Sequence, residues 1–564
     1  MPDHPYPEAG GAGIGPQDPS VRAKLPFNDW GNAQRLLAVA GDDLQYVVGR
    51  GWGVWNGAFY DFEAGEHAAR RLAVERLGQA LRDEAWAVSR GAVGPERLAE
   101  VEAEIRSRAD GAQMTAEEVR EEALGEIAGK RGRALLQWAG KCGNVGKVES
   151  ALKLAAPHRL IAIDDLDATP SRIVTQNGVL DLDAAGAPGP EAEEAEELAQ
   201  RARRWLRRHD RAMLNTRVLG CGFDPAADCP EFEAFMGLIQ PNPEIRAFLQ
   251  RALGQLLWGA NDAQVALLFR GQGANGKSTL VNALAMVFGS YAVTCRIEMF
   301  LLSQTQSAGA PSPEEVVLPG ARLYLASEPE SDATLSAAKL KALTGGEPRQ
   351  ARALHQPPFV YTPRGCPILS FNRTPKIKGD DLGTWRRLVF IPFDVNLREL
   401  PPEKQRTSSE IAAALKAEAS GILNWLLEGW RGYVADGRRL VAPPAVEALK
   451  TELRAMTDPV GEFISECTVA EDGGRIPSGD LYRVYEAWCA ENQARAISQT
   501  GFGRLLTEKG VRSFKSHGRL FRKDLVWNEE HARISEWLQG PVSSASGAST
   551  KKTKAAPHAD EADF

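Results

Sequence analysis

A glycine-rich segment in the middle of the chain has residue types suited to holding phosphate. It follows the apolar run QVALLFR and precedes the helical pattern LVNALAMVFG. Glycines let backbone N–H groups approach phosphate oxygens, and the next helix begins with a partial positive charge. The spacing G-x4-G-K-[ST] predicts a nucleoside triphosphate site, with Lys277 on the β- and γ-phosphates and Ser278 on Mg²⁺. The predicted nucleotide-binding residues are Gly271, Gln272, Gly273, Ala274, Asn275, Gly276, Lys277, Ser278 and Thr279.

Residues that end two other apolar runs could complete this site. RLYLAS is followed by Glu328, with Glu330 two residues later, and PILSFN ends in Asn372. A carboxylate at a strand end can hold Mg²⁺ and orient the attacking water, and an amide can hydrogen-bond both the γ-phosphate and that water. We predict catalytic roles for Glu328 and Asn372, and Glu328 is also the predicted metal ligand. The alternatives are a solvated carboxylate for Glu330 and a turn residue for Asn372.

Two adjacent arginines, Arg386 and Arg387, precede the apolar run LVFIPF. Such a pair is usually a surface ion-pair feature. In an NTPase that forms rings, one arginine can instead reach the neighbouring subunit's site as an arginine finger. We predict a catalytic role for this pair, with Arg387 preferred.

The same apolar runs predict the fold of the middle of the chain. QVALLFR, RLYLAS, PILSFN and LVFIPF have strand length, and helical or loop patterns separate them. Continuous apolar strands alternating with helices are typical of a parallel sheet covered on both faces.

The C-terminal part predicts three helices and a hairpin around His517-Gly518, which is a winged-helix pattern. Between Arg495 and Lys523 the only carboxylate is that of Glu508. In an acidic protein this local basic excess indicates DNA docking. An alternative is recruitment of a protein such as a primase or initiator. The predicted DNA contacts here are Arg504, Arg512, Lys515, Arg519 and Arg522.

Together these elements resemble a superfamily 3 helicase, an AAA+-type ring motor. The specific likeness is to the helicase half of phage and plasmid primase-helicases, whose relatives include the poxvirus helicase-primase. It covers about residues 25 to 400, and the C-terminal part more loosely. The segments that carry it are GNAQRL, NGVLDL, GQGANGKSTL, ARLYLASEPE, LKALTGGE with ARAL, and FNRTP with GDD, WRRL and IPF.

The resemblance implies an ATP- and Mg²⁺-dependent DNA helicase acting in replication of a phage, prophage or plasmid. It implies a homo-hexamer that binds single-stranded and duplex DNA and moves 3′ to 5′. It also implies a hairpin that projects into the ring's channel. The basic residues of that segment are Lys339, Lys341, Arg349, Arg352 and His355. We expect the family's primase and zinc module to be absent from this sequence, and the short acidic run Asp164 to Asp167 is a weak primase candidate.

The expected fold class is an α/β P-loop, AAA+-like motor core with a parallel sheet. A mainly helical domain precedes it and a winged-helix domain follows it. Two rival functions remain open: a regulatory or defence-associated P-loop ATPase that binds nucleic acid without unwinding it, and a small-molecule kinase, which has no need of a winged helix. The expected parts are a tail (1–24), a helical domain (25–215), the ATPase domain (216–400), a helical connector (401–455), the winged helix (456–530) and a second tail (531–564).

Composition sets outer bounds on these interpretations. Of 564 residues, 43% are apolar and 25% charged, which is typical of a globular protein. The net charge of −7 excludes a protein that coats nucleic acid with its whole surface. No apolar run suits a membrane span, and the N-terminus has no secretory pattern. Without an apolar span, no membrane partner is expected. The seven dispersed cysteines form no CxxC pair, so we expect no zinc site and a reducing cytoplasm, which the family resemblance implies is that of a bacterial host.

Overall fold

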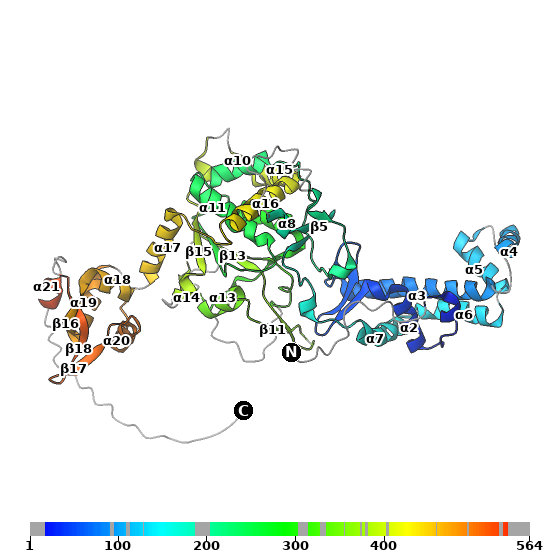
Figure 1. The fold of residues 1–564 in the computed structure, drawn as a ribbon, viewed down its shortest axis with the longest axis horizontal. Coiled ribbons are helices and arrows are strands. Elements are labelled where there is room, and N and C mark those ends of the chain that lie inside the picture. The colour runs from blue at the N-terminus through cyan, green and yellow to red at the C-terminus, as the bar shows by residue number, and fades with distance from the viewer. Residues whose placement is uncertain are drawn as a thin grey trace, which may run out of the picture. The chain divides into compact units, whose positions relative to one another are not determined.

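The computed structural model describes residues 17–90, 95–108, 113–127, 129–186, 203–302, 314–327, 334–354, 356–372, 375–377, 382–401, 405–457, 459–492, 496–528 and 534–539 (Figure 1). The chain divides into two compact units, Met1–Thr451 and Glu452–Phe564. Within the described residues, no helix is both long and apolar enough to cross a membrane.

The first unit begins with a helical region and a small sheet. Packing between α3 and α6, and between α2 and α7, forms its cores. Its helices are α1 (Pro19–Arg22), α2 (Asp29–Ala40), α3 (Gly65–Arg90), α4 (Pro95–Ser107), α5 (Ala116–Ile127), α6 (Lys130–Cys142) and α7 (Val145–Ala155). Its strands are β1 (Leu44–Val47), β2 (Gly51–Trp55) and β3 (Tyr60–Asp61). The expected helical region before the central sheet is therefore present.

A five-stranded parallel sheet lies at the centre of this unit. Its strands are β7 (Ala266–Arg270), β8 (Ala292–Thr294), β9 (Leu323–Ser327), β13 (Cys366–Phe371) and β15 (Leu388–Pro392). Their order is β15-β7-β13-β9-β8, and every neighbouring pair is parallel. The four apolar runs of the sequence are four of these strands, so the predicted parallel sheet is confirmed. The short edge strand β8 is an addition.

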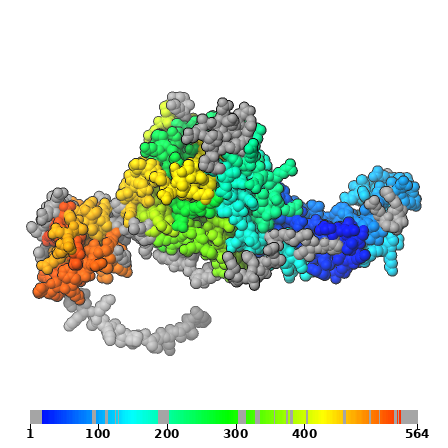
Figure 2. Space-filling model, viewed as in Figure 1, coloured from blue at the N-terminus to red at the C-terminus, as the bar shows by residue number. Residues whose placement is uncertain are grey.

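Helices pack around this sheet and share its core. They are α10 (Pro230–Ile239), α11 (Pro243–Gly254), α12 (Lys277–Phe288), α15 (Ser408–Ala417) and α16 (Ala419–Ala435). In Figure 2 the yellow segment that contains α15 and α16 lies directly against green segments of the same unit. Ile173 and Leu180 belong to the same core, from β4 (Arg172–Thr175) and β5 (Gly178–Asp181). Packing is therefore continuous across the expected boundary at residues 215/216.

Smaller elements connect the strands of the sheet. They are α8 (Leu182–Gly186), β6 (Leu206–Arg207), β10 (Thr334–Leu335), α13 (Ala337–Thr344), β11 (Arg349–Ala351), β12 (Phe359–Tyr361), β14 (Lys376–Ile377) and α14 (Leu382–Trp385). Helix α17 (Pro444–Thr457) spans the boundary between the two units.

The second unit combines helices with a three-stranded antiparallel sheet. The helices are α18 (Pro459–Cys467), α19 (Ser478–Glu491), α20 (Gln499–Glu508) and α21 (Ile534–Gln539). The strands β16 (Thr468–Pro477), β17 (Ser513–Ser516) and β18 (Arg519–Trp527) pair in the order β16-β18-β17. The expected hairpin turns at His517 and Gly518, whose φ angles of +50° and +78° suit a two-residue primed turn. The long strand β16 was not predicted.

Candidate nucleotide-binding site

The glycine-rich loop, Gly271–Gly276, joins the carboxyl end of β7 to the first residue of α12. Gly273, Ala274 and Gly276 have φ angles of +96°, +48° and +81°. A Cβ on Gly276 would lie 2.3 Å from Ile239 Cγ2, so a side chain there would collide with α10. The loop therefore depends on glycine at Gly276 for both backbone conformation and space.

Two glycine substitutions separate these requirements. Gly276→Ala places a Cβ on a residue with a left-handed φ and also 2.3 Å from Ile239 Cγ2. Gly273→Ala places a Cβ on a residue with a left-handed φ, but no atom lies within 4 Å of it. We expect Gly276→Ala to weaken nucleotide binding by at least about tenfold more than Gly273→Ala, because it alone displaces α10 from the loop. Calorimetric titration of both variants with a non-hydrolysable ATP analogue measures this. Equal losses would contradict the packing argument.

Lys277 brings the loop and the neighbouring strand together. Its side chain is 5% exposed, and its Nζ donates hydrogen bonds to Gly271 O at 2.6 Å and Asn275 Oδ1 at 3.1 Å. A third acceptor, Asn372 Oδ1, lies 3.4 Å away, just beyond the end of β13. The structure therefore brings Lys277 and Asn372 together across 95 residues of sequence. These neutral acceptors hold the ammonium group at the mouth of the loop. There it can exchange its hydrogen bonds to them for hydrogen bonds to a phosphate.

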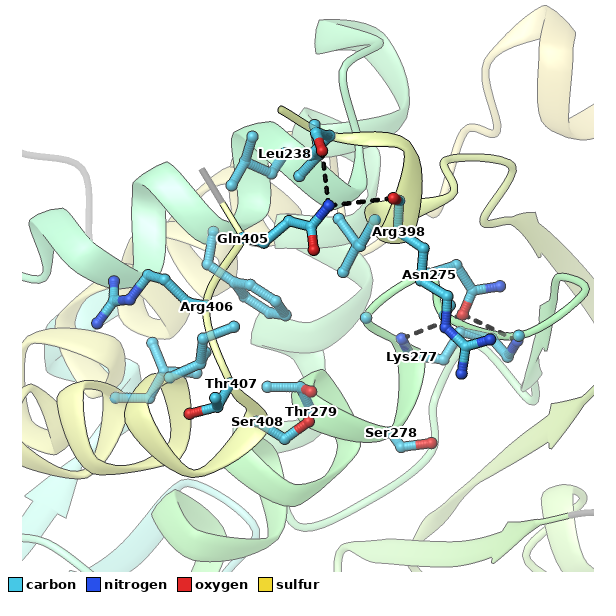
Figure 3. A pocket seen from close by; sticks show the side chains of 18 of the residues that line it. Leu238, Asn275, Lys277, Ser278, Thr279, Arg398, Gln405, Arg406, Thr407 and Ser408 are labelled. Carbon is cyan, nitrogen blue, oxygen red and sulfur yellow. Dashed lines mark hydrogen bonds between the residues drawn. The ribbon is translucent and has the colours of Figure 1, made fainter. Parts of the chain in front are cut away.

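A pocket of about 790 Å³ opens above the loop (Figure 3). Ser278, Thr279, Asn372 and the loop line it, together with Ser327 at the end of β9. Apolar side chains also line it, and sequence reasoning did not single them out: Phe235, Leu238, Leu397, Ile411 and Leu415. The pocket therefore combines polar groups suited to phosphates with apolar side chains suited to a nucleoside.

Charged and polar side chains close the pocket's rim. Arg406 pairs with Glu231 of α10, and the Gln405 amide donates to Arg398 O at 3.1 Å and Leu400 O at 2.7 Å. Figure 3 shows Gln405 against the Arg398 backbone, with the Arg398 side chain beside Lys277 and Asn275. The segment before α15 is thus held to α10 by an ion pair and is stabilised internally by hydrogen bonds. No local sequence pattern signals these residues, because they join the loop only through the tertiary fold.

The fit of this site to Mg²⁺ rests on few protein groups. Ser278 lines the pocket at the start of α12, where a hydroxyl can serve as a metal ligand. The predicted acid Glu328, and Glu330, lie outside the described residues. Within the described chain, no three His, Cys, Asp or Glu side chains gather as a metal site.

The arginine pair lies at the opposite end of the sheet from the loop. Ala266, the first residue of β7, donates its N–H to Arg387 O at 2.8 Å. The guanidinium groups of Arg386 and Arg387 both donate to Gln264 Oε1, at 3.3 and 3.1 Å. The five-residue strand β7 places about 16 Å between this end and the loop. Neither arginine therefore reaches the pocket of its own chain, and Arg386 is the more exposed of the two.

The predicted DNA contacts of the first unit have different surroundings. Lys339 Nζ donates to Glu298 O at 3.2 Å, and burial lowers its pKa despite the nearby carboxylates Glu314 and Glu315. Arg352 is exposed and donates to Gln356 O at 3.1 Å. Lys341 lies on α13 and is half-buried, and His355 lies outside the described residues.

Arg349 has a structural partner that the sequence did not indicate. Its guanidinium forms a two-pronged contact with the carboxylate of Glu315, which also accepts the Tyr361 hydroxyl at 2.9 Å. Glu315 is 13% exposed in this ion pair. The Arg349 side chain, 25% exposed, therefore fastens β11 and β12 to the preceding segment, and its predicted phosphate contact stays a prediction.

The basic residues of the second unit also fall into two groups. Arg504, Arg512, Lys515 and Arg519 are exposed and remain candidate DNA contacts. Arg522 is 3% exposed, and its guanidinium donates to Gly503 O, Thr507 Oγ1 and Val511 O at 2.7 to 3.0 Å. Burial lowers its pKa. The prediction that Arg522 contacts DNA is wrong, because this side chain fastens β18 to α20.

A matched pair of substitutions tests this division. Arg522→Ala should destabilise the second unit by about 2–4 kcal/mol, because two buried carbonyls lose a charged donor and a cavity forms. Arg512→Ala should leave stability unchanged and weaken DNA binding, with a smaller salt dependence. Hydrogen exchange of α20 in the full chain and binding across a salt series measure the two effects. Unchanged α20 protection in Arg522→Ala would contradict the structural role.

Comparisons with known proteins find two family matches, one on each side of the glycine-rich loop. Residues 33–241 match a family described as D5 N terminal like, and residues 456–526 match one described as Poxvirus D5 protein-like. "Putative helicase L207/L206" of Acanthamoeba polyphaga mimivirus is 29% identical over 297 residues, 50% of this chain and 30% of that protein. "Putative helicase 022R" of Frog virus 3 is 26% identical over 284 residues, 48% of this chain and 29% of that protein.

Solved structures give a weaker likeness. Two apo structures of the NrS-1 C terminal region align over 53% and 56% of this chain, and over 76% and 79% of theirs. Their identities are 16% and 15%, with TM-scores of 0.35 and 0.38. The chain spans about 30% of the length of the two viral relatives. The chain thus carries a D5 N terminal-like region and a poxvirus D5-like region and is a distant relative of viral putative helicases.

Proposed function

We propose that this protein is an ATP- and Mg²⁺-dependent DNA helicase of superfamily 3 that works as a ring. The observation that carries the proposal is the meeting of Lys277 and Asn372 at a pocket lined by both polar groups and apolar side chains. The glycine-rich loop before α12 supports a P-loop role for this segment. Similarity to viral putative helicases supports DNA unwinding as the work that hydrolysis drives.

Each group of the site has a distinct task in the proposed reaction. Backbone N–H groups of the loop and the Lys277 ammonium bind the β- and γ-phosphates. Ser278 and Glu328 hold Mg²⁺, which supplies charge neutralisation on the phosphates when bound. Glu328 also orients the attacking water, and Asn372 contacts the γ-phosphate and so responds to its loss. The apolar side chains of α10 and α15 exclude water from the nucleoside.

The proposed ring follows from the position of the arginine pair. A guanidinium about 16 Å from its own loop can serve catalysis only in another chain's site. Each pocket would then lie between two subunits, with Arg386 or Arg387 of the next chain stabilising charge on the transferred phosphoryl group. A homo-hexamer moving 3′ to 5′ on single-stranded DNA is the form that the family resemblance implies.

The DNA contacts and setting complete the proposal. The helices and sheet of the second unit support a winged-helix role, with Arg504, Arg512, Lys515 and Arg519 on duplex phosphates. Lys339, Lys341 and Arg352 would contact the strand inside the ring. The setting is replication of a phage, prophage or plasmid in a bacterial cytoplasm, and a separate primase or initiator is a further partner.

Hydrolysis with and without DNA tests this proposal. The full chain with ATP and Mg²⁺ should release phosphate, and single-stranded DNA should raise the rate, because a motor couples turnover to its track. Electron microscopy with an ATP analogue and single-stranded DNA should show rings. Hydrolysis that DNA does not affect, together with particles that form no ring, would favour the non-unwinding ATPase. Phosphate transfer to a small acceptor would favour a kinase.

A further inference from the structure

The sheet of the second unit buries one face and leaves the other exposed. Ile476 and Arg522 lie opposite each other across β16 and β18 and are 1% and 3% exposed. Arg522 points to α20, so this face covers the core. Consecutive side chains of a strand point to opposite faces, which places Phe521 on the outer face.

An aromatic pair occupies this outer face. Phe521 lies directly opposite Phe514 of β17, with ring centroids 5.7 Å apart and planes 24° from parallel. Pro477 lies opposite Phe521 on its other side, on β16. Both rings are half-buried and stand outside the described core of this unit. Three strands thus present an apolar row that packing of the described core does not account for.

Cations surround this aromatic row. The Arg475 guanidinium carbon lies 5.8 Å from the Phe521 ring centroid, and Arg475 is paired in register with Lys523. Arg519 and Lys523 lie two residues to either side of Phe521 and therefore share its face. Lys523 pairs with Asp524, whose carboxylate is 3.5 Å from Lys523 Nζ. Arg475 and Arg519 are exposed on the two flanks of the row.

We propose that this outer face binds unpaired bases of a single-stranded nucleic acid. Bases stack on Phe514 and Phe521, while Arg475 and Arg519 contact the phosphates on either side. Aromatic rings offer π faces to any base, whereas the bases of a duplex have already stacked on one another. The positive flanks complement a phosphate backbone and not an apolar partner. The inference adds a single-strand site to the proposed helicase and is independent of its ATP chemistry.

Two oligonucleotides of equal charge, one with bases and one without, separate the contribution of base stacking to binding from that of phosphate contacts. Binding of a labelled 12-mer oligothymidylate to the full chain is compared with binding of an abasic 12-mer, by fluorescence anisotropy. The variant Phe514→Leu/Phe521→Leu keeps apolar bulk and loses the π faces. Its affinity for oligothymidylate should fall at least about tenfold, with little change for the abasic strand. Channel residues of the motor bind both strands through phosphates and so cancel in this comparison. Oligouridylate distinguishes RNA from DNA.

A second variant keeps the proposal falsifiable. Phe514→Tyr/Phe521→Tyr retains the rings and should bind oligothymidylate like the unaltered chain, and hydrogen exchange of α19 verifies folding in both variants. Equal binding of both strands by the unaltered chain would overturn the proposal and leave this face to a protein partner. An unchanged preference for oligothymidylate in the leucine variant would overturn it, as would an equal loss on both strands or failure of the tyrosine variant to retain binding.

Discussion

Replacing Lys277 with alanine should remove most ATP binding and with it all measurable turnover. The ammonium group is buried within the loop beside Gly271 O and Asn275 Oδ1, whereas the pocket's other cations, Arg398 and Arg406, come from the segment after β15. Two charge-assisted hydrogen bonds to phosphate oxygens contribute about 1.5–3 kcal/mol each, so ATP affinity should fall at least about a hundredfold. Titration calorimetry measures the affinity, and phosphate release measures turnover.

A lysine near the pocket provides the control for this substitution. Lys416 lies on α15, is exposed and does not line the pocket. Lys416→Ala removes the same charge from the same region and should leave affinity and turnover unchanged. If Lys277→Ala bound ATP as the unaltered chain does, phosphate binding by the glycine-rich loop would be wrong.

Mixing two inactive variants should restore part of the ATPase activity. Arg386→Ala or Arg387→Ala removes the proposed finger, whose loss typically costs ~10³–10⁵ in rate. Lys277→Ala removes the loop's own cation. In a mixed ring, some interfaces pair an intact loop with an intact finger, so activity should return without either variant recovering alone. Exposure favours Arg386 as the finger, whereas sequence reasoning preferred Arg387, so both variants are tested.

Subunit exchange is the control for the mixing experiment. Differently tagged variants, co-purified through one tag, verify that mixed rings form. A further arginine, Arg251 of α11, pairs with Asp436 and does not line the pocket. Arg251→Ala should remain active by itself. Verified mixed rings with no recovered activity would place the whole catalytic site within one chain and end the ring mechanism.

The parts of this protein that local physical chemistry dictates could be predicted from sequence. The strands β7, β9, β13 and β15 are continuous apolar runs, and a sheet buried on both faces requires such runs. The conformation of the glycine-rich loop can be predicted from its composition, because glycines such as Gly276 adopt φ angles that other residues avoid. The meeting of Lys277 with Asn372 follows from the shared carboxyl edge of parallel strands.

Interactions between distant segments could not be predicted in the same way. The apolar lining of the pocket joins α10 to α15, and neither helix carries a nucleotide-binding pattern. Arg349 and Arg522 look like exposed cations in the sequence, yet Glu315 in one case and three acceptors near α20 in the other bring them into the fold. The protein partner of a basic residue is known only once the tertiary structure is known. Counting basic residues in the sequence therefore overestimates the number that can contact nucleic acid.

Separation of a forked DNA duplex by the full chain tests the central claim most directly. One strand carries a fluorophore and the other a quencher, and the fork has single-stranded 3′ and 5′ tails. With ATP and Mg²⁺ the fluorescence should rise, whereas a non-hydrolysable analogue or Lys277→Ala should give no rise. A fork with only a 3′ tail should be opened faster than one with only a 5′ tail. Vigorous ATP hydrolysis on these forks without strand separation would contradict the account, because it would show an ATPase that does not unwind DNA.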